Sequence, residues 1–208
     1  MPDADMIDRL RRFERAFPRF EDTWRRLVAD GQHPTTLFIG CSDSRLVPYL
    51  LMDCGPGELF LVRNVGNLVP PYDDSASHGS GAAIEFAVLN LKVRHIVVCG
   101  HTHCGAIRAL YEPPPPEARH LTGWLTHARG AILPVMASPE ALRRVEQRNV
   151  ALQLEHLMSY PMVRREVEAG TLSLHGWHYV LEDGRVLVLD VASGRFEPVA
   201  ALSEAPSP

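Results

Sequence analysis

The 208-residue sequence lacks several features that would place it in a protein class at once. It has no uninterrupted apolar stretch near the roughly 18 residues that a membrane-spanning helix needs, so we expect no membrane partner. Its first 17 residues alternate charged and apolar side chains. That pattern differs from a secretory leader and favours the cytoplasm. A strong charge excess is also missing, because the net charge of −4 argues against nucleic acid as a partner.

Cysteine is scarce, and its distribution points away from disulfides. The four residues are Cys41, Cys54, Cys99 and Cys104, and no Cys-x-x-Cys pair occurs among them. The missing pair argues against a thiol redox enzyme. In a reducing compartment, cysteines close to histidines are more often metal ligands or catalytic thiols than disulfide partners.

Strand-like and helix-like segments alternate along the central part of the chain. Short β-prone runs cover residues 35–40, 58–62 and 95–99. Helices are expected over residues 82–91, 119–137, 140–159 and 161–169, and a hairpin over 172–181 and 185–191. Such alternation is typical of parallel pairing. The fold class is therefore α/β: a mostly parallel central β-sheet flanked by helices, with an N-terminal helical arm and a C-terminal hairpin.

The N-terminal arm is predicted as two helices, or one helix kinked near Pro18. Its apolar residues recur at helical spacing: Ile7, Leu10, Phe13, Phe17, Phe20, Trp24, Leu27 and Val28. We expect this stripe to pack in the core of its own domain, and packing against another subunit is the alternative. The whole chain, residues 1–208, is read as one domain, with the arm at 1–31, the α/β core at 32–202 and a loose tail at 203–208.

Two of the predicted strands end on potential metal ligands. The first delivers Cys41, and the third delivers His101 and Cys104. Because reactive groups in open α/β sheets gather beyond the carboxyl ends of the strands, we expect these side chains to meet. Two thiolates and one ring nitrogen leave a fourth tetrahedral position open, which is the pattern of catalytic zinc. The sequence therefore predicts a Zn²⁺ site, although His101 and Cys104 alone would also suit half of a structural zinc clamp.

Asp43 and Arg45 follow the first ligand. Side chains at positions i and i+2 can converge in a loop, and arginine can hold a carboxylate by two parallel hydrogen bonds. An ionised Asp43 would accept a hydrogen bond from zinc-bound hydroxide, whereas a released Asp43 could coordinate the zinc and close the site. Alone, the pair would be a loop ion pair of little energetic value. His103, between two ligands, is a candidate proton relay or a hydrogen-bonding loop residue.

The sequence Cys-Ser-Asp-Ser-Arg at 41–45, followed by Gly-His-Thr-His-Cys-Gly at 100–105, resembles the paired signature of β-class carbonic anhydrases. Residues 60–69, 81–88 and 174–179 resemble that family as well. The resemblance implies reversible hydration of CO2 to bicarbonate and a proton. It also implies the same three zinc ligands, with Asp43 and Arg45 as the catalytic dyad. Family members form dimers or assemblies of dimers, with the active site at the subunit interface and the N-terminal helices around the neighbour.

The resemblance extends to the substrate pocket. Members closed by the aspartate share a Trp, Arg, Tyr trio that binds bicarbonate. The matching positions here are Phe38, Arg63 and Tyr179, so the indole N–H is missing. The open, plant-like branch places its substrate-pocket residues at positions that here hold Gln32, Phe60, Val65, Phe86 and Gly105. The resemblance implies that the partner subunit supplies Gln32, Phe60 and Phe86.

The pocket residues suit CO2. An apolar wall of Phe60, Val65 and Phe86 can hold the molecule without charge, although Phe86 replaces the tyrosine usual in that branch. The Gln32 amide and the Gly105 backbone N–H could donate hydrogen bonds to a substrate oxygen. Hydrolysis of COS or CS2 on the same zinc is the alternative function. A zinc-stabilised bicarbonate sensor or scaffold is a third, and the intact Asp43–Arg45 pair counts against it.

Overall fold

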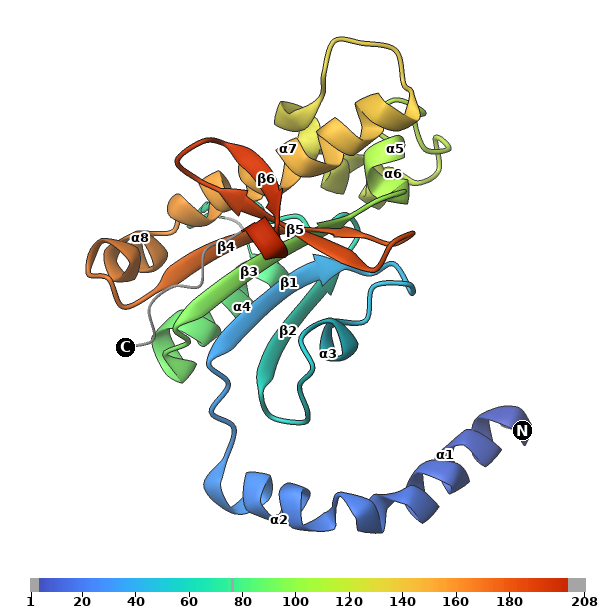
Figure 1. The fold of residues 1–208 in the computed structure, drawn as a ribbon, viewed down its shortest axis with the longest axis vertical. Coiled ribbons are helices and arrows are strands. Elements are labelled where there is room, and N and C mark those ends of the chain that lie inside the picture. Colours follow the sequence, from blue (N-terminus) through green and yellow to red (C-terminus); the bar gives the residue numbers. More distant parts are fainter. Residues whose placement is uncertain (1–3, 76, 202–208) are drawn as a thin grey trace.

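A computed structural model describes residues 4–75 and 77–201, built around one six-stranded sheet (Figure 1). The strands are β1 (Thr36–Cys41), β2 (Leu59–Asn64), β3 (His95–His101), β4 (Ser173–Val180), β5 (Arg185–Asp190) and β6 (Arg195–Pro198). Their spatial order is β2-β1-β3-β4-β5-β6. The first four in this order pair in parallel, and β5 and β6 are antiparallel. The predicted α/β fold with a mostly parallel sheet is confirmed, and β6 is an addition to the expected hairpin.

The helices are α1 (Ala4–Ala16), α2 (Glu21–Asp30), α3 (Pro48–Leu51), α4 (Gly79–Glu85), α5 (Gly105–Arg108), α6 (Arg119–Trp124), α7 (Pro139–Met158) and α8 (Pro161–Glu168). A π-helix continues α4 over Phe86–Leu91, and 3-10 turns cover Phe17–Arg19, Leu125–Ala131 and Val199–Ala201. The single-turn helices α3 and α5 escape sequence analysis because four residues carry too little periodicity. Across residues 4–75 and 77–201, no helix combines the length and the apolar character needed to span a membrane.

The helix expected over residues 119–137 is wrong beyond Ala131. Pro134 has no backbone N–H to continue the helix. Just before it, the Tyr111 hydroxyl donates to the Leu133 carbonyl (3.0 Å) and accepts from the Leu133 N–H (3.1 Å). A side chain from another segment thus replaces the helical hydrogen bonds at this point.

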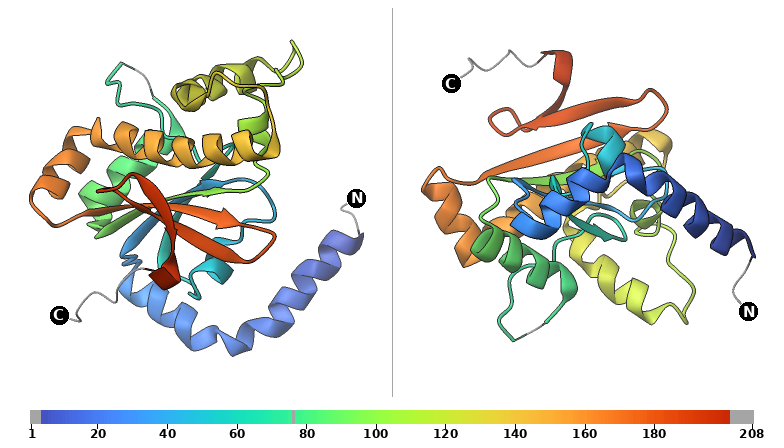
Figure 2. Two further views of the ribbon diagram at one scale, coloured as in Figure 1. Left: turned by 45° about the horizontal axis from the view of Figure 1, so that its top comes forward. Right: turned by 90° about the horizontal axis from the view of Figure 1, so that it is seen from below.

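The two faces of the sheet have different coverings. Alternate residues of a strand point to opposite faces, so Leu37 and Ile39 of β1 pack with residues of α4, α7 and α8. Phe38 points the other way and packs with Leu46 and the Trp177 ring. Figure 2 shows α7 lying across the sheet. The same period-two alternation fixes which residues of β1 face each covering.

Two glycines allow close packing just before the expected metal ligands. A Cβ on Gly100 would lie 2.7 Å from Cγ2 of Val150 in α7. A Cβ on Gly40 would lie 2.7 Å from the Phe38 ring. Both distances are shorter than real Cβ contacts, so only glycine lets α7 and the neighbouring side chains approach the strands this closely.

The N-terminal arm forms the two predicted helices, α1 and α2, and it extends away from the sheet (Figure 1). Neither helix contains a buried residue. Core packing of the apolar stripe is therefore wrong for the single chain. None of its members is buried, and five are exposed: Leu10, Phe13, Phe20, Trp24 and Val28. The physical reason is that the 3-10 turn at Phe17–Arg19 and the extended residues before β1 carry the arm away from the core. The tail predicted over 203–208 lies outside the described residues.

Candidate metal centre and active site

The expected ligands meet where the strand order reverses. From β1 the chain moves to β2 on one side, and it then returns to β3 on the other side of β1. Cys41 ends β1, His101 ends β3, and Cys104 directly precedes α5. A reversal of this kind opens a crevice at the carboxyl ends of parallel strands, where α/β proteins place their ligands.

The geometry of the three side chains fits a tetrahedral metal ion. Ligand atoms of Cys41, His101 and Cys104 lie within 4.8 Å of one another, and all three residues are buried. Among the residues that the structure describes, this is the one cluster of three or more such side chains. The two sulfurs are 3.9 Å apart. Sulfurs at ~2.3 Å from a tetrahedral Zn²⁺ would be about 3.8 Å apart, so the spacing matches.

The His101 ring is oriented for metal binding. Its Nδ1 lies 2.8 Å from the Thr102 carbonyl oxygen, which can only accept, so Nδ1 carries the proton. The neutral ring then has a lone pair on Nε2. That nitrogen is buried and has no hydrogen-bond partner among the described residues. A buried lone pair without a partner costs free energy that a bound cation would recover.

The two thiols share one proton when no metal is bound. The hydrogen bond from the Cys104 thiol lowers the pKa of Cys41 to about 4, with further help from the Gly66 N–H. The same interaction, together with burial, raises the pKa of Cys104 well above its ordinary value. Cys41 is therefore the more acidic of the two thiols, and a bound metal would displace the proton that Cys104 retains.

Asp43 and Arg45 form the predicted ion pair. Arg45 Nε donates to Asp43 Oδ1 at 2.9 Å, and a terminal nitrogen donates to Oδ2 at 2.7 Å. The Arg45 backbone N–H also donates to Oδ1, at 3.0 Å. These bonds, with the guanidinium first among them, hold the pKa of Asp43 well below its usual range. Oδ2 also lies 3.9 Å from His101 Nε2, so the carboxylate borders the metal cluster while Arg45 holds it.

Arg63 stabilises the loop that carries the pair. Its guanidinium donates to the Cys41 carbonyl at 3.1 Å and to the Asp43 carbonyl at 2.7 Å. The sequence predicts Arg63 only as a member of the bicarbonate trio, and no local pattern indicates this role. The two bonded segments lie about 20 residues apart, so only the parallel pairing of β1 with β2 brings them together.

The predicted substrate residues fall into two groups. Val65 directly precedes Gly66, whose N–H lies 3.4 Å from Cys41 Sγ, and Gly105 directly follows Cys104. These two lie beside the cluster. Gln32 precedes β1, and Phe60 pairs with Leu37, near the start of β1.

Phe86 belongs with this second group. Its ring stacks on that of Phe60, with a centroid distance of 5.7 Å. Leu37 precedes Cys41 by four residues, so Phe60 lies about 13 Å from the cluster along the strand direction. One chain therefore does not bring Gln32, Phe60 and Phe86 to its own metal cluster.

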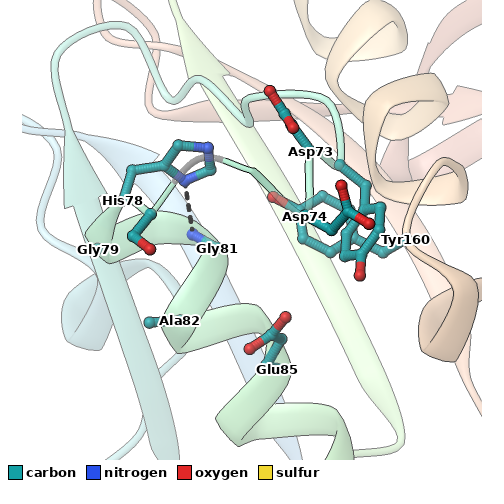
Figure 3. Close-up of a pocket in the computed structure, with 10 residues that line it drawn as sticks. Asp73, Asp74, His78, Gly79, Gly81, Ala82, Glu85 and Tyr160 are labelled. Atoms are coloured by element: carbon teal, nitrogen blue, oxygen red, sulfur yellow. Dashed lines mark hydrogen bonds between the residues drawn. The ribbon is translucent and has the colours of Figure 1, made fainter.

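A separate cavity of about 440 Å3 lies between α4 and Tyr160 (Figure 3). Its lining includes Asp73, Asp74 and Glu85, together with His78, which accepts a hydrogen bond from the Gly81 N–H. None of the cluster residues lines it. The cavity is acidic, and it takes no part in the site described above.

Comparison with known proteins gives the family. The carbonic anhydrase family model matches residues 36–186. A carbonic anhydrase of Pseudomonas aeruginosa is 43% identical over 203 residues, covering 94% of this chain and 91% of the relative. The solved structure of the β-carbonic anhydrase CcaA superposes with a TM-score of 0.88 at 35% identity, covering 96% of this chain and 92% of that one. The chain belongs to the β-carbonic anhydrase family.

A further structural relative is one of two tetrameric β-carbonic anhydrases from Sordaria macrospora. Its TM-score is 0.75 at 28% identity, and the match covers 89% of this chain and 97% of that one. Membership confirms the predicted family and the predicted enzyme class, a carbonate dehydratase. The Cys-His-Cys cluster of this carbonic anhydrase is able to hold a metal ion.

Proposed function

We propose that this carbonic anhydrase interconverts CO2 and bicarbonate on a Zn²⁺ held by Cys41, His101 and Cys104. The observation that supports zinc most directly is the buried, unpartnered Nε2 of His101, facing two sulfurs at tetrahedral spacing. Two thiolates and one imidazole are a preferred ligand set of catalytic zinc. When bound, zinc lowers the pKa of a coordinated water to about 7 and so supplies hydroxide near neutral pH.

Asp43 and Arg45 are proposed to orient the nucleophile. Because both oxygens of Asp43 accept from Arg45, the carboxylate is ionised and fixed. Its Oδ2 would then be placed to accept a hydrogen bond from the nucleophile. Because Arg45 holds Asp43, the carboxylate is not free to coordinate the metal. This supports a site that is open to water, as in the plant-like branch. The Gly105 N–H would donate to a substrate oxygen, and Val65 would contribute to the apolar wall.

A second copy of the chain is proposed to complete the pocket. Gln32, Phe60 and Phe86 lie too far from the metal cluster of their own chain, and Phe86 is 42% exposed. The exposed apolar stripe of α1 and α2 likewise suits the surface of a partner subunit. We therefore propose a homodimer, or an assembly of dimers, of single-domain chains. A reducing compartment such as the cytoplasm would keep the cluster thiols available for the metal.

The test is the Cys104→Ser variant. We expect it to lose zinc and CO2 hydration together, because a serine hydroxyl stays protonated and is a poor zinc ligand. Cys54→Ser is the matched control, since Cys54 is outside the cluster, and it should keep both properties. Zinc content is measured by atomic spectrometry, and turnover by stopped-flow with a pH indicator.

Two results would contradict the proposal. Full CO2 turnover by a metal-free sample would exclude the zinc mechanism. A wild-type enzyme that hydrolyses COS and leaves CO2 unchanged would show that the substrate is wrong.

A further inference from the structure

The turn between β4 and β5 reaches the loop that carries two of the cluster residues. Glu182, in this turn, places one carboxylate oxygen on each of two adjacent residues of that loop. Oε2 accepts from the Thr102 hydroxyl at 2.6 Å, and Oε1 lies 2.6 Å from His103 Nε2. Because a carboxylate only accepts, His103 Nε2 carries the proton and donates. A weaker contact joins Oε1 to Arg143 at 3.4 Å.

The bond to Thr102 bears on a metal ligand. The Thr102 carbonyl accepts from His101 Nδ1 and so sets the tautomer and direction of that ring. The Thr102 residue is in turn held on three sides. Its N–H donates to the Tyr179 carbonyl at 3.0 Å, and its hydroxyl accepts from the Leu181 N–H at 3.0 Å while donating to Glu182.

The bond to His103 bears on the dyad. His103 has a φ of 58°, in the left-handed region that non-glycine residues enter at a cost. In this conformation its carbonyl accepts from Arg45 at 3.2 Å, and the same terminal nitrogen of Arg45 donates to Asp43. The hydrogen bond from His103 to Glu182 opposes relaxation of the strained backbone, so it keeps that carbonyl in place.

We propose that Glu182 is a positioning residue for catalysis, which holds the Thr102–His103 turn so that His101 and Arg45 keep their working orientations. The residue acts through these neighbours. Hydrogen bonds from Thr102 first, and from His103, lower the pKa of Glu182 to about 2. Its carboxylate is therefore ionised, and able to accept, at neutral pH. This inference rests on the proposed zinc chemistry.

The test compares Glu182→Ala with Glu182→Gln in the zinc-loaded, full-length enzyme. For the alanine variant we expect kcat per bound zinc to fall about tenfold, with KM changed by less than about twofold, because orientation is lost and binding is kept. Glutamine still accepts from Thr102 and should restore at least about half of the wild-type kcat. Asp183→Ala is the matched control, since Asp183 has the same 40% side-chain exposure, pairs with Arg185 and should keep full activity.

A second variant tests the route through the strained backbone. His103→Gly combined with Glu182→Ala should recover at least about threefold in kcat over Glu182→Ala alone, since glycine adopts a positive φ without strain. No recovery would show that the His103 backbone does not transmit the effect of Glu182, and this result would overturn the inference.

Three further outcomes are decisive. A Glu182→Ala enzyme with wild-type kcat per zinc would overturn the inference, even if it melts at a lower temperature or binds less zinc. Equal losses in the alanine and glutamine variants would also overturn it, because hydrogen bonding would then not be the cause. A wild-type protein without zinc or without CO2 turnover would overturn the proposed function, and this inference with it.

Discussion

Replacing Asp43 by asparagine tests the centre of the proposed mechanism while leaving the shape of the side chain almost unchanged. Three donors of Arg45 point at the carboxylate: the backbone N–H, Nε and a terminal nitrogen. The amide oxygen of asparagine can keep the first two. Its NH2 group, however, would replace Oδ2 and oppose the terminal nitrogen, which now lies at 2.7 Å. The group bordering His101 would then be a donor without negative charge.

The size of the effect follows from that single oxygen. A hydrogen bond to a charged group contributes about 1.5–3 kcal/mol, and each ~1.36 kcal/mol of barrier is tenfold in rate. We therefore expect kcat to fall about 10- to 150-fold. Zinc content should stay at the wild-type level, because no ligand changes. Stability should change by ~1 kcal/mol or less, since the Arg45 side chain is 52% exposed and solvent screens the pair.

Stopped-flow CO2 hydration at several pH values checks this prediction. The pKa of Asp43 is lowered, chiefly by the Arg45 side chain, from an ordinary value of 3.8. The carboxylate is therefore ionised at every pH above that value, and the loss should be equal at pH 7 and pH 9. Asp190→Ala, which removes a half-buried carboxylate at the end of β5 and outside the cluster, is the control and should be fully active. Undiminished kcat in Asp43→Asn, with zinc bound, would refute the reasoning.

Two further predictions concern stability. Gly100→Ala should lower the free energy of unfolding by about 1–3 kcal/mol, because its Cβ would meet Val150 Cγ2 at 2.7 Å. Adding Val150→Ala should recover part of the loss, and denaturant titrations measure both variants. Burial raises the pKa of Tyr160 from 10.0 to about 12, and its hydroxyl donates to the Pro70 carbonyl. The folded state thus favours the neutral phenol. The contribution of Tyr160 to the free energy of unfolding is therefore fully present below pH 10 and is lost as pH rises toward 12. Tyr160→Phe should lack this pH-dependent loss.

Much of the architecture is readable from local pattern. The apolar runs before Cys41 and His101, each ending in glycine, predict buried parallel strands, and their spacing around an intervening helix predicts the crossover. The residue types after these strands predict the metal cluster. Short-range patterns suffice here because strands and their carboxyl-end loops are set by neighbours a few residues away.

Contacts between segments that are distant in the chain cannot be predicted from local pattern. The bond from Thr102 to Glu182 spans 80 residues, and the glutamate stands in an ordinary turn sequence before Asp183 and Gly184. Nothing local marks it as part of the site. The bonds from Arg63 to the Cys41 loop depend in the same way on strand pairing.

The sequence by itself determined the family, the sheet and the residues of the Cys-His-Cys cluster, because chemistry-bearing residues stand directly after periodic apolar runs. The tertiary structure alone decided which His101 nitrogen carries the lone pair, how Arg45 holds Asp43, and that the arm leaves its own core. Those outcomes depend on distances and directions between segments far apart in the chain. Hydrogen bonds require both to be correct within a few tenths of an ångström, and residue order does not specify that.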